Sequence, residues 1–251
     1  MRMPGCAAVL GHRACPATLA RYREARAFLR HAMEVLLILT APTEPGVALP
    51  EGTLLLGAED IFLPAYGAKS ASRRIVPGNV DLMLLALGRA RPGHARYWLI
   101  EYDVFFPAGP APLLALEAAE ADLLAAHQWR RPDSAAWPHW ATLHCPGVPE
   151  ERQLAAFLPL ARYSPALLAA MESRYRAGWH GHCEALVPTV ALDAGLRVAM
   201  LNAERGRPML DARSFGDRRC GPVAPDYAYH PVKTEADAAA LRTALGLRAW
   251  L

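Results

Sequence analysis

The sequence contains no run of about 18 consecutive apolar residues, so we expect no transmembrane helix. Residues 1–5 (MRMPG) lead directly into an apolar segment and lack the layout of a signal peptide. The formal net charge is only +3, from 27 Lys and Arg against 24 Asp and Glu, which is too small to indicate nucleic-acid binding by itself. We therefore expect a cytoplasmic protein that binds no nucleic acid, with a peripheral membrane contact left open.

Cysteine and lysine are scarce, and the common nucleotide-binding motifs are missing. The five cysteines are widely spread and include no C-x-x-C pair, which argues against a zinc ribbon and indicates reduced thiols. Lys69 and Lys233 are the two lysines among 27 basic residues. No G-x-G-x-x-G, P-loop or G-x-S-x-G sequence occurs, so the usual marks of Rossmann dehydrogenases, P-loop NTPases and α/β-hydrolases are absent.

Apolar residues, by contrast, make up 53% of the 251 residues, which excludes disorder as the main state. The length suits one large α/β domain or two small ones, and no linker divides the chain. Apolar runs predict strands at residues 6–11, 34–39, 53–56, 97–100, 121–126, 153–160 and 197–201. Helical spacing and end signals predict helices at 18–30, 79–87, 112–119, 165–175, 184–193 and 235–245. Residues 132–149 and 206–229 are expected to form loops.

The order of these elements predicts the fold class. Strands and helices alternate through the first half of the chain, which is typical of an α/β protein with a mostly parallel sheet. We expect a single Rossmann-like domain over residues 1–251, with helices flanking a central sheet.

Two acidic residues, Glu101 and Asp103, directly follow the predicted strand at 97–100. Ligands of parallel α/β sheets bind at the carboxyl ends of the strands, so this pair is expected in the ligand crevice. Two ionised carboxylates need a cation, and oxygen ligands suit Mg²⁺ or Mn²⁺, which usually complete their coordination with substrate phosphates. Taken alone, the pair favours the alternative in which one carboxylate caps a turn and the other is solvated.

The segment WLIEYDVFF (residues 98–106) resembles the D-x-D segment of GT-A fold glycosyltransferases. In that family the motif closes a central strand and holds a divalent metal on the diphosphate of a nucleotide sugar. The resemblance therefore implies a GT-A-like fold with Glu101 and Asp103 as metal ligands. Glu101 stands where the motif has its first Asp, a departure that is also found within the superfamily.

Residues 181–184 (GHCE), followed after a predicted helix by residues 195–198 (GLRV), resemble the G-x-x-E-D … G-x-x-V region of inverting members. The resemblance implies that Glu184 is the general base that deprotonates the acceptor hydroxyl, while Ala185 replaces the second acid. A carboxylate near a helix N-terminus is favoured as the anion by the helix dipole. An ordinary glutamate in a first helical turn is the alternative.

Residues 229–233 (YHPVK) resemble the late H-x-x-K element of several GT-A families. The resemblance implies that His230 is a further metal ligand and that Lys233 reaches the diphosphate. Imidazole suits Mn²⁺ better than Mg²⁺, and a lysine acts on phosphate as a point charge. An exposed loop before the last helix is the alternative.

Other polar residues are candidates for contacts with the donor. Gly11 and Arg13 follow the first strand, where the GT-A fold receives the base and ribose, although a polar turn explains them equally. Arg73 and Arg74 precede the helix that leads to the acid pair, and guanidinium groups suit bidentate contacts with a diphosphate. We expect Asn79 to cap that helix rather than to bind a ligand.

Tryptophan and histidine gather at residues 129–144 and 179–182. Flat rings stack on sugar faces, so the first segment is a candidate acceptor wall or lid, but a loop pinned by hydrophobic anchors is the favoured interpretation. His180 and His182 lie two residues apart on a predicted turn, which is weak evidence for a metal site. We interpret them as contacts with the acceptor or the donor.

The sequence thus predicts a metal-dependent, inverting glycosyltransferase that uses Mn²⁺ or Mg²⁺. Residues 1–128 would bind a UDP- or GDP-type nucleotide sugar, and residues 129–251 would bind a glycan, lipid-linked or small-molecule acceptor and carry out catalysis. A sugar nucleotidyltransferase is one alternative, although the Gly-rich phosphate loop of such enzymes is missing. A non-catalytic GT-A-like binding domain is another, supported by Glu101 and Ala185.

Overall fold

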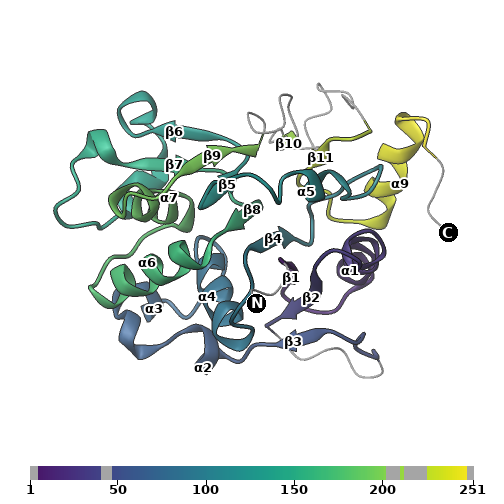
Figure 1. Cartoon of the computed structure of the whole chain (residues 1–251), viewed down its shortest axis with the longest axis horizontal. Coiled ribbons are helices and arrows are strands. Elements are labelled where there is room, and N and C mark those ends of the chain that lie inside the picture. Colours follow the sequence, from purple (N-terminus) through teal and green to yellow (C-terminus); the bar gives the residue numbers. More distant parts are fainter. Residues whose placement is uncertain (1–4, 41–46, 202–209, 212–224, 248–251) are drawn as a thin grey trace.

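The computed structural model describes residues 5–40, 47–201, 210–211 and 225–247 (Figure 1). Its centre is a seven-stranded sheet in the order β3-β2-β1-β4-β8-β5-β9. Strands β3, β2, β1 and β4 run parallel, β5 and β9 run parallel, and β8 is antiparallel to both of its neighbours. The strands of this sheet are β1 (Cys6–Gly11), β2 (Glu34–Leu39), β3 (Thr53–Leu55), β4 (Tyr97–Glu101), β5 (Leu123–Ala125), β8 (Leu160–Tyr163) and β9 (Val198–Met200).

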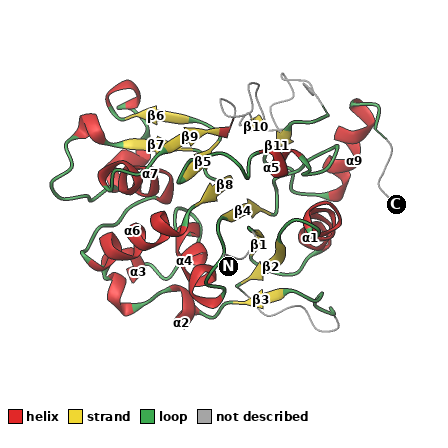
Figure 2. Cartoon of the chain, viewed as in Figure 1, coloured by secondary structure: helices red, strands yellow, loops and turns green. Residues whose placement is uncertain are grey.

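Helices cover both faces of the sheet (Figure 2). The helices are α1 (Pro16–Leu29), α2 (Ala58–Ile61), α3 (Ala68–Ala71), α4 (Val80–Ala90), α5 (Pro112–Ala115), α6 (Pro165–Arg176), α7 (Cys183–Asp193) and α9 (Glu235–Ala244). Two small sheets lie outside the main one: β6 (Gln128–Arg130) with β7 (Leu154–Ala156), and β10 (Leu210–Asp211) with β11 (Ala228–Tyr229). Among the described residues, no helix is long and apolar enough to cross a membrane.

The apolar runs become central strands because both of their faces are covered. Ala8 and Leu10 of β1 belong to a core cluster with α4, α6 and α7, whereas Ala7 and Val9 belong to a second cluster with α1 and α5. Every residue of β1 is buried, which is why the run shows no apolar–polar alternation. The fold class expected from the sequence, an α/β domain with a mostly parallel sheet, is confirmed.

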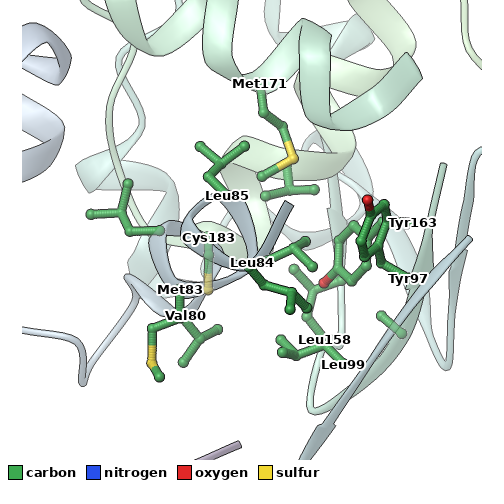
Figure 3. Packing of buried hydrophobic residues seen from close by; sticks show 14 of the residues in the cluster. Val80, Met83, Leu84, Leu85, Tyr97, Leu99, Leu158, Tyr163, Met171 and Cys183 are labelled. Carbon is green, nitrogen blue, oxygen red and sulfur yellow. The ribbon is translucent and has the colours of Figure 1, made fainter. Parts of the chain in front are cut away.

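Figure 3 shows how the first of these clusters is filled. Leu84 and Leu85 of α4, Leu99 of β4 and Met171 of α6 are all at most 3% exposed. Side chains of α4 and β4 therefore share one closely packed core cluster, which keeps the helix on this face of the sheet.

The prediction of one strand at 153–160 was wrong. The segment contains β7, which pairs with β6 in a hairpin, and then Leu160 begins β8 in the main sheet. Pro159 lies between them, and proline has no N–H to donate to a strand ladder. The chain therefore changes sheets within this run and enters the main sheet antiparallel to β4.

Gly88 does not end the helix predicted at 79–87, because α4 continues to Ala90. A Cβ atom at Gly88 would lie 2.9 Å from the Cδ1 atom of Leu168 on α6. This glycine therefore serves close helix packing rather than termination. Of the loop expected at 206–229, residues 210–211 and 228–229 form β10 and β11, while 206–209 and 212–224 lie outside the described residues.

Candidate active site

Glu101 and Asp103 lie at the carboxyl edge of the main sheet. Glu101 ends β4 and pairs with Leu10 near the end of β1. The Tyr102 N–H donates to the Leu10 carbonyl at 2.9 Å, and the Val104 N–H donates to the Glu101 carbonyl at 2.9 Å. This turn keeps both carboxylates at the edge of the sheet, where the sequence placed them.

His230 is brought to this edge by backbone hydrogen bonds rather than by its neighbours in sequence. Tyr229 exchanges two backbone hydrogen bonds with Phe105, at 2.8 and 2.9 Å, and the Val232 N–H donates to the Asp103 carbonyl at 2.7 Å. The His230 Nε2 atom consequently lies 3.3 Å from Asp103 Oδ1 and 3.9 Å from Glu101 Oε2.

The three side chains fit a divalent metal. One ligand atom from each of Glu101, Asp103 and His230 lies within 4.8 Å of the other two. Asp103 Oδ1 is buried and accepts no hydrogen bond in the described structure, so this oxygen is left for a cation. Two carboxylate oxygens and one imidazole nitrogen suit Mn²⁺, and suit Mg²⁺ less well.

The electrostatics of the three side chains also favour a bound cation. Burial, followed by the charge of Asp103, raises the pKa of Glu101 to about 7, and Glu184 also contributes to the rise. Two carboxylates so close together without a cation are costly to ionise, and a bound cation removes that cost.

Glu184 joins the same group from the opposite half of the chain. It lies in the first turn of α7, and its Oε1 accepts a hydrogen bond from the Leu158 N–H at 3.4 Å. Burial raises the pKa of Glu184 to about 7, while the Leu158 hydrogen bond and the charge of His230 oppose this rise. The carboxylate is therefore held near the cluster, with a pKa suited to proton transfer near neutral pH.

The remaining candidate residues have different surroundings in the structure. Arg13 is exposed and acts electrostatically on Tyr102, between the two acids, which places it at the same edge. Gly11 has a packing role, because a Cβ atom there would lie 2.6 Å from Thr18 Cγ2 on α1. Lys233 is exposed, three residues after His230.

Arg73 and Arg74 also have different surroundings. The Arg73 guanidinium lies over the ring of Phe62, 5.9 Å from its centroid, and its φ of 48° is in the left-handed region. Arg74 lines a pocket of about 390 Å³ that opens beside the site. Asn79 is the residue before α4, as expected, but its side chain makes no cap and instead donates to the Arg74 carbonyl at 2.8 Å.

This pocket, here called the histidine pocket, is formed by three chain segments far apart in sequence. Its lining residues that carry charge or an imidazole are Lys69, Arg74, His139, His180 and His182. His182 joins the pocket to Glu184, because its Nδ1 accepts from the Glu184 N–H at 3.3 Å and lies 3.9 Å from Glu184 Oε2.

Sequence reasoning missed the ion pair beneath the pocket. Lys69 and Asp81 are each 1% exposed, and Lys69 Nζ lies 3.0 Å from Asp81 Oδ2. The same ammonium donates to the carbonyls of Gly78 at 3.1 Å and Gly181 at 2.9 Å, so it joins two turns 103 residues apart. The scarcity of lysine was the one sequence signal that drew attention to Lys69.

The tryptophan-rich segment is packed together as a unit. The ring of Trp137 makes edge contacts with those of Trp129, Trp140, His139 and His182. Trp140 is buried, which agrees with the favoured interpretation of a loop pinned by hydrophobic anchors. His139 stacks on His182, and so ties this loop to the histidine pocket.

No family model matches the sequence, and no curated protein matches it. Among solved structures, the chain is similar to mouse xyloside xylosyltransferase 1 in its apo form, with 12% identity and a TM-score of 0.44 over 91% of this chain and 97% of that one. It is also similar to the galactosyltransferase LgtC in complex with donor and acceptor sugar analogues, with 11% identity and a TM-score of 0.49 over 98% of each chain. Both solved structures are of glycosyltransferases.

Proposed function

We propose that this protein is a metal-dependent glycosyltransferase that moves a sugar from a nucleotide-sugar donor to a hydroxyl acceptor with inversion. The observation that carries the proposal is the meeting of Glu101, Asp103 and His230 within 4.8 Å, with Glu184 in electrostatic reach of them. These residues come from segments up to 129 positions apart. They are the metal ligands and the general base that the motif resemblance implies.

The donor is proposed to bind at the carboxyl edge of the main sheet. Glu101, Asp103 and His230 would hold Mn²⁺ or Mg²⁺, which when bound supplies positive charge to stabilise the departing diphosphate. Arg13, at the end of β1, is available to the nucleotide, and Lys233 is available to the diphosphate as a second fixed cation. The nucleotide is therefore expected to lie across the carboxyl ends of β1 and β4.

Glu184 is proposed as the general base. Its Oε1 is held by the Leu158 N–H, which leaves Oε2 to receive the proton of the acceptor hydroxyl. The acceptor oxygen then bonds to the anomeric carbon, while the bond from that carbon to the diphosphate breaks and the diphosphate leaves with the electron pair. Attack opposite the leaving group inverts the configuration.

A binding experiment tests the donor site directly. Thermal unfolding is measured with a panel of nucleoside diphosphates and nucleotide sugars, with and without Mn²⁺. A ligand at about 100 times its dissociation constant stabilises the native state by roughly 2.7 kcal/mol. For a chain of this size, that corresponds to a rise of roughly 5–10 °C in the melting temperature.

The matched variants are Asp103→Asn and, as a control, Asp133→Asn, which changes an exposed aspartate outside the cluster. We expect a metal-dependent rise with one nucleotide base, lost in Asp103→Asn and retained in Asp133→Asn. If no nucleotide stabilises the protein in either metal condition, the transferase proposal is wrong.

A further inference from the structure

The histidine pocket lies beside the proposed base, and none of the described residues that line it is a carboxylate. His182 provides the connection, since it both lines the pocket and lies 3.9 Å from Glu184 Oε2. A molecule held in the pocket therefore lies one side chain, that of His182, away from Glu184. Glu101, Asp103 and His230 are not among the described lining residues, so the pocket is distinct from the candidate metal site.

Lys69 is not the cation that a ligand would meet. Its three ammonium protons are matched by three acceptors: Asp81 Oδ2 and the carbonyls of Gly78 and Gly181. Its charge is balanced by Asp81, and both side chains are buried. Lys69 instead fastens together the two turns that form the pocket wall.

Arg74 is the cation left available. It is exposed at the pocket, and no described carboxylate pairs with its guanidinium. Its backbone is nevertheless held, because Asn79 Nδ2 donates to the Arg74 carbonyl at 2.8 Å and to Ser72 Oγ at 3.2 Å. A guanidinium on a fixed backbone suits bidentate recognition of a planar or tetrahedral anion.

Two imidazoles of the pocket lining stack on each other. His139 and His182 stack with their centroids 3.8 Å apart and their planes 20° apart. Burial, together with His139 and Lys69, lowers the pKa of His182 to about 4, so this ring is neutral at physiological pH. Because its Nδ1 accepts from the Glu184 N–H, the proton is on Nε2, which makes that atom a donor.

We infer that the histidine pocket binds an acceptor that carries an anionic group, a carboxylate or a phosphate, which pairs with Arg74 while an acceptor hydroxyl lies at Glu184. This inference rests on the proposed function and names its acceptor class. Among the described lining residues, an anion would meet the exposed guanidinium of Arg74 and no opposing carboxylate, which favours an anionic acceptor over a neutral one.

The test uses three probes on the full chain: methyl β-D-glucuronide, glucose 6-phosphate and the neutral methyl β-D-glucoside. Binding is measured by titration calorimetry, and histidine ring NMR signals locate the bound probe at His139 and His182. We expect at least one anionic probe to bind about tenfold or more tightly than the neutral one, as is typical for a charge-assisted hydrogen bond. Comparing the affinities of the glucuronide and the sugar phosphate shows whether the pocket prefers a carboxylate or a phosphate.

Arg74→Ala should remove this preference, and Arg74→Lys should retain part of it. Arg73→Ala removes the neighbouring guanidinium, which lies over Phe62 and not in the pocket lining, and should leave the preference unchanged. Equal binding of the neutral probe, an anion preference that survives Arg74→Ala, or no binding by any probe would overturn the inference.

The nucleotide and Mn²⁺ titration, run on the same preparations, separates the two proposals. If nucleotide binding depends on Asp103 but no anion preference is found, the transferase proposal stands and the anionic-acceptor proposal is wrong. If an anion preference depends on Arg74 but no nucleotide binds, the anion site stands. Its assignment as the acceptor site of a transferase is then wrong.

Discussion

Replacement of Glu184 by glutamine is expected to abolish transfer and, at the same time, to stabilise the metal-free protein above pH 7. The side chain is 17% exposed, and burial raises its pKa from 4.5 to about 7. An acid whose pKa is raised by folding binds more protons in the folded state between these two values. Stability therefore falls as the pH rises through this window, and the full cost is present above pH 7.

The size of the effect follows from that shift. The difference between 4.5 and about 7 corresponds to about 3 kcal/mol at 1.36 kcal/mol per unit. The dipole of α7 favours the anion by roughly 0.3–1 kcal/mol, which reduces the expected gain for Glu184→Gln to about 2–3 kcal/mol. Glutamine keeps an oxygen that can accept from the Leu158 N–H, so this backbone donor keeps its partner.

The assay is thermal unfolding in the presence of a chelator, at about pH 8 and about pH 5. The Glu184→Gln melting temperature should exceed that of the wild type by roughly 4–12 °C at the higher pH. At the lower pH the difference should shrink, because the wild-type carboxyl is then largely protonated.

Glu172→Gln is the matched control, and its expected change in stability has the opposite sign. Burial raises the pKa of Glu172, but hydrogen bonds from Tyr66 and Arg176 outweigh this, so its pKa is lowered overall. Its neutral variant should be less stable than the wild type at the higher pH. The reasoning is refuted if Glu184→Gln gains no stability above pH 7, or gains as much at about pH 5.

Two further predictions concern the frame around the site. Gly11→Ala should lower the free energy of unfolding by about 1–3 kcal/mol, because its Cβ would meet Thr18 Cγ2 at 2.6 Å. Adding Thr18→Ser removes that methyl group and should recover most of this loss, as measured by urea unfolding. Lys69→Met should cost about 3–5 kcal/mol by leaving Asp81 buried without its cation, and the double variant with Asp81→Asn should recover most of it. Equal stability of single and double variants would contradict either argument.

Local patterns in the sequence were sufficient for the elements that build the donor edge. The runs at 6–11 and 34–39 match β1 and β2 residue for residue, because strands covered on both faces are continuously apolar. The positions of Glu101 and Asp103 after such a run placed them at the carboxyl edge. Glu184 was placed in the first turn of a helix by the same kind of local signal.

The sequence determined which segments become strands and helices and which acids end them, since burial and helix end signals act over a few residues. The tertiary structure decided the rest. An apolar run does not specify strand direction, so the insertion of β8 antiparallel between β4 and β5 was not predictable. His230 meets Asp103 through backbone pairing of residues 105 and 229, and the histidine pocket depends on Lys69 joining residues 78 and 181. Such contacts form only when distant segments pack together, and no local pattern records them.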